Sequence, residues 1–373
     1  MRLRRTLFFA AWLKLGTAFG LVLGLTLGIY SSMAHAEEKL GEISVSDLLI
    51  EPTFNLTEPK TGSFNPGYSY LGATWRLDNM LSSTIKAGSL DLLGVPARFG
   101  PAPASTQLGV IEAYGQLESD YGRFRVGQVP ISFGLEGGEN EPRLLLPRSL
   151  LFQYRYIVLR DYGMTYRILN EGFFSDWAIH NGEGGPDLDN EMWFTARWGW
   201  QGGDFFRSGI SATVGRTNPQ STNPTGITDP TALASADAAA GLDITLPAKI
   251  RIANLFFGWE FEPFSLEVEA EIGDMDQTTK LTGMRAAHAD FQWNLVPGLT
   301  PLLRLDVLEP HAEIGGDMIS EGTIGLAWKS HYENSVLTIA ATQRVVQNVN
   351  PDIHKLMIIW RLTPVASNFR TLL

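Results

Sequence analysis

The sequence predicts an all-β protein: a transmembrane antiparallel β-barrel of about sixteen strands whose third extracellular loop folds inward. Three observations predict it: an export segment at the N-terminus, a recurrent two-residue alternation of apolar and polar side chains, and links that alternate between short and long. The chain has 373 residues, 44% of them hydrophobic, and no cysteine. Disulfides, thiolate metal sites and cysteine nucleophiles are therefore excluded.

Residues 1–36 are predicted to be a cleavable signal peptide, and residues 37–373 the outer-membrane β-barrel. A basic start precedes an apolar run from Leu15 to Tyr30, and small residues follow up to Ala36. This order is typical of a secretory signal, with cleavage after Ala36. The alternative is a permanent membrane anchor, but Lys14 limits the apolar run to about 16 residues, whereas a spanning helix needs roughly 20.

The charge balance restricts the partners. Removing the predicted signal leaves 25 basic and 40 acidic residues, so the exported part is strongly acidic. A general nucleic-acid binder needs a concentrated basic face, which this composition does not supply. We therefore expect no nucleic-acid partner.

The strands are predicted from the alternation, which is clearest from Phe264 to Ile272, where the glutamates share one face and the apolar side chains the other. The predicted strands are 42–50, 67–78, 82–91, 106–118, 121–129, 160–170, 172–181, 190–200, 207–216, 248–259, 263–273, 282–295, 299–308, 321–330, 334–344 and 354–362. An even number of strands suits a barrel with both termini on the periplasmic side.

A soluble sandwich and a membrane barrel both show strands in which apolar and polar residues alternate, so the alternation cannot distinguish them. The lengths of the links between strands can. Short links centre on Asn79, Ser119-Asp120, Glu171, Gly202-Gly203, Glu262, Pro297-Gly298 and Tyr332-Glu333. Long links cover 51–66, 92–105, 130–159, 181–189, 217–247, 274–281, 309–320 and 345–353. A sandwich has no reason to separate loop lengths by parity, so the pattern favours an outer-membrane barrel with aromatic residues near its strand ends.

A barrel of sixteen strands is wide enough to hold water, so its inward face should carry charge. The predicted lumen wall includes Arg76, Glu112, Glu118, Glu267, Glu269, Glu271, Arg304 and Asp306. The hairpin at Ser119-Asp120 should place Glu118 opposite Arg123 and Gln116 opposite Arg125. The alternative role for these charges is stability of the wall.

The third long loop, from Pro130 to Leu159, is the most informative segment. Its run Leu144-Leu145-Leu146 and its later leucines need burial, which the barrel interior would provide. The predicted channel constriction comprises Glu136, Glu139, Glu141, Arg143 and Arg148 of this loop with Arg123 and Arg125 of the wall. Opposed charges at a constriction sort solutes by size and charge. The alternative is a hydrophobic plug or an outer cap.

The same region resembles a known family. The segment Arg123-Phe124-Arg125-Val126-Gly127-Gln128-Val129-Pro130-Ile131-Ser132-Phe133-Gly134-Leu135-Glu136, then Arg148-Ser149-Leu150 and Arg160-Asp161-Tyr162-Gly163, resembles the phosphate-selective porin O/P type over about 40 residues. The resemblance implies a sixteen-stranded, usually trimeric outer-membrane channel constricted by this loop. The resemblance is weaker support for phosphate selectivity in this chain. Phosphate-specific members of the family are expected to line the channel with basic residues, whereas the mature chain is acidic.

The predicted function is that of an outer-membrane porin, a water-filled channel for passive diffusion of small hydrophilic solutes and ions. The alternatives are an anion- or phosphate-selective porin and a structural or adhesive barrel with little conductance. No recognisable serine motif accompanies the histidines, so no enzymatic activity is expected. No cofactor is expected, and the acidic loop 183–191 lacks the spacing of an EF-hand calcium loop. The expected partners are outer-membrane lipid, lipopolysaccharide and two further copies of the chain in a homotrimer, in a Gram-negative outer membrane.

Overall fold

The computed structural model describes residues 42–57, 61–65, 69–89, 108–137, 144–154, 156–182, 191–203, 205–217, 248–277, 280–330, 335–347 and 353–362. By its contacts the chain divides into Met1–Glu42 and Ile43–Leu373, and all described residues except Glu42 belong to the second unit. The predicted signal peptide and its cleavage point lie outside the described residues. No helix in the described part of the chain is long and apolar enough to cross a membrane.

The described residues form strands almost throughout, with one short helix. The strands are β1 (Glu42–Leu49), β2 (Thr53–Thr57), β3 (Thr61–Asn65), β4 (Ser69–Arg76), β5 (Leu81–Ser89), β6 (Leu108–Ser119), β7 (Gly122–Pro130), β8 (Arg160–Asn170), β9 (Phe173–His180), β10 (Trp193–Gly202), β11 (Phe206–Thr217), β12 (Ala248–Phe261), β13 (Phe264–Gln277), β14 (Lys280–Trp293), β15 (Leu299–Glu309), β16 (Ile319–Lys329), β17 (Ser335–Val346) and β18 (Ile353–Leu362). The helix α2 (Leu150–Gln153) lies between β7 and β8.

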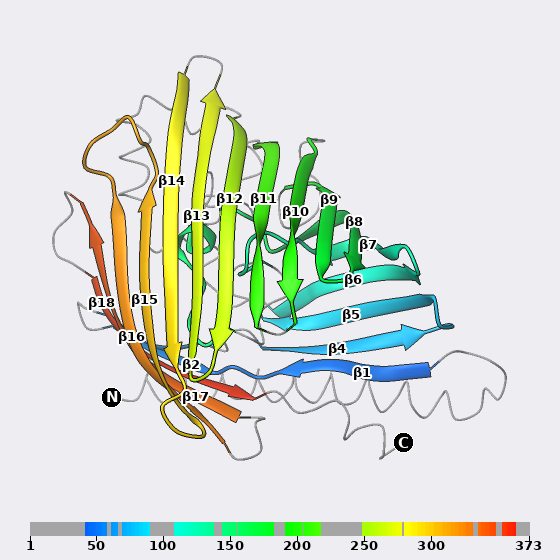
Figure 1. Ribbon diagram of the computed structural model, residues 1–373, viewed down its shortest axis with the longest axis horizontal. Helices are drawn as coiled ribbons and strands as arrows, with labels where there is room; N and C mark the ends of the chain where they lie inside the picture. The colour runs from blue at the N-terminus through cyan, green and yellow to red at the C-terminus, as the bar shows by residue number, and fades with distance from the viewer. Residues whose placement is uncertain are drawn as a thin grey trace, which may run out of the picture. The chain divides into compact units, whose positions relative to one another are not determined.

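The strands join into one closed ring, which is the transmembrane barrel (Figure 1). Consecutive strands from β4 to β18 pair in chain order, and β18 closes the ring by pairing antiparallel with β2. β2 pairs with β3, and β1 pairs with β4. We therefore count β1 and β2 as two parts of one barrel strand, and β3 and β4 as two parts of the next. The eighteen strands of the described residues then make sixteen barrel strands, which confirms the predicted strand number.

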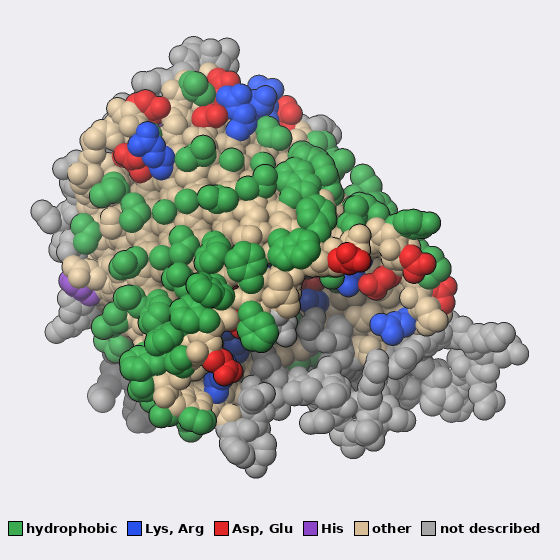
Figure 2. All heavy atoms as spheres, viewed as in Figure 1, with side chains coloured by type: hydrophobic (Ala, Val, Ile, Leu, Met, Phe, Trp, Pro, Cys, Tyr) green, Lys and Arg blue, Asp and Glu red, His purple; other side chains and the backbone are tan. Residues whose placement is uncertain are grey.

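Apolar and charged side chains occupy opposite faces of the ring, as the alternation predicted. On β13, Ile272 is 66% exposed and points outward, whereas Glu269 is fully buried on the inward side. Trp293 and Trp328 also lie on the outward face, where hydrophobic side chains form a broad band (Figure 2). Such a band matches the hydrocarbon layer of a membrane, which leaves no water for unpaired backbone groups and therefore requires a closed sheet.

Two of the predicted long links are wrong. Residues 51–66 contain β2 and β3, and residues 274–281 are mostly strand because β13 continues to Gln277 and β14 begins at Lys280. In this upper part of β13 the inward Met275 is buried while the outward Asp276 is exposed, which reverses the polarity found lower on the strand. The outward face turns polar there because the strand rises above the apolar band.

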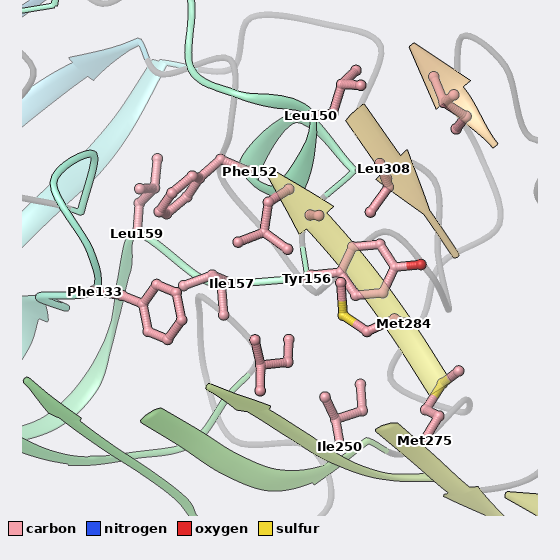
Figure 3. Close-up of a cluster of buried hydrophobic side chains, with 14 of the residues drawn as sticks. Phe133, Leu150, Phe152, Tyr156, Ile157, Leu159, Ile250, Met275, Met284 and Leu308 are labelled. Carbon is pink, nitrogen blue, oxygen red and sulfur yellow. The ribbon is translucent and has the colours of Figure 1, made fainter. Parts of the chain in front are cut away.

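The inward folding of the third long loop is confirmed by its hydrophobic packing. Phe133, Phe152, Tyr156 and Ile157 form one buried cluster with apolar side chains of the inner wall (Figure 3). The wall residues of this cluster are Trp193, Ala248, Ile250, Ile252, Met275, Met284, Ala286, Leu308, Ile319 and Val346. A second cluster packs Leu146 against inner side chains of β15 to β18. The loop is thus part of the barrel's core.

Placing arginine at Val268 is expected to lower the free energy of unfolding by roughly 2 to 4 kcal/mol, because this outward side chain would put a charge into hydrocarbon. Denaturant titration of the protein in lipid vesicles measures the change. Val268→Ala is the control for lost volume and should have a smaller effect. An unchanged unfolding free energy for both Val268→Arg and Leu266→Arg would show that this face does not contact the membrane.

Candidate channel constriction

The loop leaves β7 at Pro130 and turns inward at Gly134. The turn requires glycine: the Gly134 φ is +55°, and a Cβ at this position would lie 1.9 Å from Oε2 of Glu269. At the base of the loop, the Ile131 N–H donates to the Leu159 carbonyl oxygen at 2.9 Å. The two ends of the loop are therefore held together at the wall.

The first part of the loop is fixed to the wall through its backbone. The Gly134 N–H donates to Ser211 Oγ at 2.9 Å, and the Leu135 N–H donates to Glu269 Oε1 at 2.8 Å. Arg197 donates from Nη1 to the Gly134 carbonyl oxygen at 2.8 Å. Side chains of β10, β11 and β13 thus hold one turn of the loop.

Glu136 is the central polar contact of the loop. Its carboxylate accepts from Arg304 Nη2 at 2.6 Å and from the Ser149 N–H at 2.7 Å. Burial by itself would raise the pKa of Glu136, but the charge of Arg304, with His288 and the Ser149 bonds, lowers this pKa to about 2. Glu136 is therefore ionised at neutral pH. Arg148, also fully buried, donates from Nε to the Glu136 carbonyl oxygen at 2.7 Å.

Arg304 on β15 connects the loop to two strands. Besides Glu136, its guanidinium binds the Asp290 carboxylate on β14 and the Pro147 carbonyl oxygen of the loop. Glu136, Asp290 and His288 each offer a ligand atom within 4.8 Å of the others, a spacing that suits a metal ion. The Arg304 guanidinium already supplies the positive charge there, since it donates to both carboxylates.

The helix α2 is the second anchor of the loop. The Leu150 N–H, at its first residue, donates to Asp306 Oδ2 at 2.6 Å. Gln153, at its last residue, accepts from Arg344, which also donates to Glu321 Oε2 at 2.7 Å. Strands β15, β16 and β17 therefore hold this half of the loop.

The acidic residues predicted on β13 lie mainly behind the loop. Glu269 and Glu271 are buried and share one donor, because Asn254 Nδ2 is 2.7 Å from Glu269 Oε2 and 2.9 Å from Glu271 Oε1. Glu267 is half-buried beside Asp290. These carboxylates were predicted to line the lumen; the structure places Glu269 against the loop and buries Glu271 beside it.

A row of basic side chains lies on the inner face of β7 to β10. Arg123 is in register with Arg167, Arg167 with Asp176, and Asp176 with Arg197. Both Arg167 and Arg197 form ion pairs with Asp176. Arg123 is also 3.2 Å from Glu118, and the predicted register of Glu118 with Arg123 and of Gln116 with Arg125 is confirmed.

The remaining predicted wall residues are separated from these groups. Glu112 is buried and forms ion pairs with Lys86 at 3.2 Å and with Arg160 at 2.8 Å. Arg76 is exposed at the end of β4. The structure thus brings Glu136 and Arg148 together with Arg304, close to Asp306, and Arg123 and Arg125 together with Glu118.

Three of the predicted constriction residues, Glu139, Glu141 and Arg143, lie outside the described residues. Sequence reasoning missed Arg167 and Asn254 as site residues. The signal that could have found Arg167 is its position two residues after Thr165 on an alternating strand, which places it on the inward face.

Comparisons with known proteins support the fold. No protein-family model and no curated protein sequence matches the chain. The trimer form of OmpT, an outer membrane protein of Vibrio cholerae, matches 87% of this chain and 99% of its own, with TM-score 0.62 and 10% identity. An anion-selective porin from Comamonas acidovorans matches 86% and 100%, with TM-score 0.60 and 9% identity. The outer membrane channel DcaP of Acinetobacter baumannii matches 87% and 98%, with TM-score 0.59 and 8% identity. At such low identities the likeness shows a shared fold.

Proposed function

We propose that the chain is an outer-membrane porin, a water-filled channel for passive diffusion of small hydrophilic solutes and ions. The observation that carries the proposal is the contrast between two sides of the barrel interior. The loop covers the side formed by β10 to β17, whereas the inward side chains of Glu118, Arg123 and Arg167 on β6 to β8 are 51%, 33% and 27% exposed. Charged inward groups that reach solvent support a wet passage on that side. This function involves no catalysis.

The proposal includes a cellular location and binding partners. We place the protein in the outer membrane of a Gram-negative bacterium, reached through the predicted signal peptide, with lipid and lipopolysaccharide around the apolar band. A homotrimer is the proposed assembly, and the similarity to a solved barrel in trimer form supports it.

Single-channel recording in planar bilayers tests the proposed function. The purified protein is expected to insert as stepwise, ohmic conductance, because the passage is open without a ligand. Heat-denatured protein at the same concentration is the control. Intact protein that inserts into the bilayer and passes no steady current would favour the second class of function, a structural or adhesive barrel.

An anion-selective channel, as in the O/P type that the sequence resembles, is the second candidate. The observation that favours it is the basic row: Arg123, Arg167 and Arg197 face the interior. Arg167 and Arg197 share Asp176 as their acidic partner. The acidic side chains of Glu269 and Glu271 are buried, and the Leu135 N–H of the loop binds Glu269, so they face the passage less than the row does. The general porin stays the leading proposal because the mature chain is acidic.

A further inference from the structure

His288 on β14 is a buried histidine among carboxylates. Its side chain is 3% exposed and faces the barrel interior. It lies in register with Glu269 of β13 on one side and with Asp306 of β15 on the other. Asp290 follows two residues later on the same face of β14, and Glu136 approaches from the loop. Acidic side chains from three strands and from the loop therefore meet around one imidazole.

The His288 ring is not explained by hydrogen bonding. Among the described residues, its Nε2 atom has no hydrogen-bond partner. Nε2 lies 3.7 Å from Glu269 Oε1, which is too long for a hydrogen bond. A proton on Nε2 would therefore stay unbonded in a buried place, at a cost in free energy. Without that proton, the Nε2 lone pair faces a carboxylate, and the two repel each other unless a cation lies between them.

The distances around His288 suit the ligands of one metal ion. Glu136, His288 and Asp290 each offer a ligand atom, and these atoms lie within 4.8 Å of one another. Ligand atoms of a tetrahedral zinc ion stand roughly 3.4 Å apart, because each bond is about 2.0 to 2.2 Å long. The 3.7 Å between His288 Nε2 and Glu269 Oε1 is close to this spacing, so Glu269 is the fourth candidate ligand.

The balance of charge favours a divalent cation at this place. Arg304 contributes one positive charge, which it shares between Glu136 and Asp290. The hydrogen bonds to Glu269 come from neutral donors, a backbone N–H of the loop and the Asn254 amide. Three ionised carboxylates and one guanidinium leave two negative charges, which a divalent ion neutralises. Buried charge without such compensation is costly.

The hydrogen bonds already present leave the carboxylates able to bind a metal. Each oxygen of Glu136 accepts one bond, from Arg304 Nη2 and from the Ser149 N–H. A carboxylate has about four lone-pair sites on its two oxygens, so sites remain for an ion. Metal-binding carboxylates are usually oriented by hydrogen bonds of this kind. Arg304 therefore orients two ligands and does not replace the ion.

We propose that Glu136, Glu269, His288 and Asp290 bind a divalent transition-metal ion, and that Zn²⁺ is the ion that fits this site. An imidazole together with carboxylates is a typical zinc ligand set, whereas calcium takes more ligands and prefers oxygen for all of them. The ion joins the loop, through Glu136, to β13 and β14. The inference goes beyond the proposed passage of solutes, and it does not require that the barrel conducts.

The test is equilibrium dialysis of the full, detergent-solubilised protein against Zn²⁺ after removal of metal with a chelator. We expect one bound zinc ion per chain. His288→Ala and Glu269→Gln should each bind zinc at least roughly tenfold more weakly, because each removes a ligand. Glu269→Gln keeps an oxygen that can accept from the loop N–H. His354→Gln is the matched control, since His354 is exposed on β18, and it should bind zinc as the wild type does.

X-ray absorption at the zinc edge of the loaded wild-type protein tests the ligand set without a substitution. We expect one imidazole nitrogen, with oxygen ligands at about 2.0 to 2.2 Å. Heat-modifiable mobility shows whether each variant is folded. Three results would overturn the inference: no zinc bound by the wild type at micromolar concentration, wild-type affinity in folded His288→Ala or Glu269→Gln, or a spectrum without imidazole. Displacement of zinc by an equal concentration of calcium would overturn the choice of ion.

Discussion

Replacing Arg304 by methionine is expected to lower the free energy of unfolding by about 3 to 5 kcal/mol. Methionine keeps most of the side-chain volume and removes the charge. The buried carboxylates of Glu136 and Asp290 then lose the guanidinium that binds both of them, and the Pro147 carbonyl oxygen loses its donor. Denaturant unfolding in vesicles measures the loss, and single-channel conductance should rise because the loop loses one of its polar anchors on β15.

Arg216→Met is the matched control for this prediction. Arg216 pairs with Glu191 at 3.3 Å, but the two side chains are 52% and 41% exposed, so the same substitution should cost less than about 1 kcal/mol. Adding Glu136→Gln to Arg304→Met should recover part of the loss, because it removes one of the unpaired charges. If Arg304→Met unfolds at the wild-type denaturant concentration, the bonds of Arg304 do not stabilise the fold, and the loop is held by its other contacts.

Most of the barrel could be predicted from the sequence because the membrane imposes two-residue periodicity on each strand. One exception has a clear physical cause. Strands that rise above the hydrocarbon carry polar residues outward, as Asp274 and Asp276 do, and there the apolar-outward pattern ends before the strand does. The pairing of β2 with β3 was missed although Thr53 to Thr57 alternates, because both strands have only five residues and lie within a segment that was assigned as a long link.

The inward loop could be predicted, but its contacts could not. Its leucines required burial, and the interior of the barrel was the available place. The partner of Glu136 is Arg304, 168 residues away in sequence. Alternation shows that Arg304 faces inward, but it does not show where a loop crosses the lumen or at what height. For the same reason, Glu269 was assigned to the open wall, although the Leu135 N–H of the loop covers it.

The basic row on β7 to β10 is expected to set the ion preference of the channel. In the double variant Arg123→Gln, Arg167→Gln, the anion-to-cation permeability ratio should fall roughly tenfold, since a lumen lined by one sign of charge concentrates the opposite ion by such factors. Glu118 would lose its ion-pair partner Arg123, while Asp176 would keep Arg197. The reversal potential in a potassium chloride gradient measures the change, which should be toward cations.

The effect depends on the position of the charges as well as their number. Arg251→Gln removes a positive charge from the outward face and should leave the reversal potential unchanged. Glu118→Gln removes a negative charge from the passage and should shift the reversal potential toward anions, opposite to the double variant. Salt screens such charges over about 8 Å in bulk solution, but a narrow lumen with low-dielectric walls retains much of their field, so the opposed shifts should persist at physiological ionic strength. A double variant with the wild-type reversal potential would place the basic row outside the permeation path.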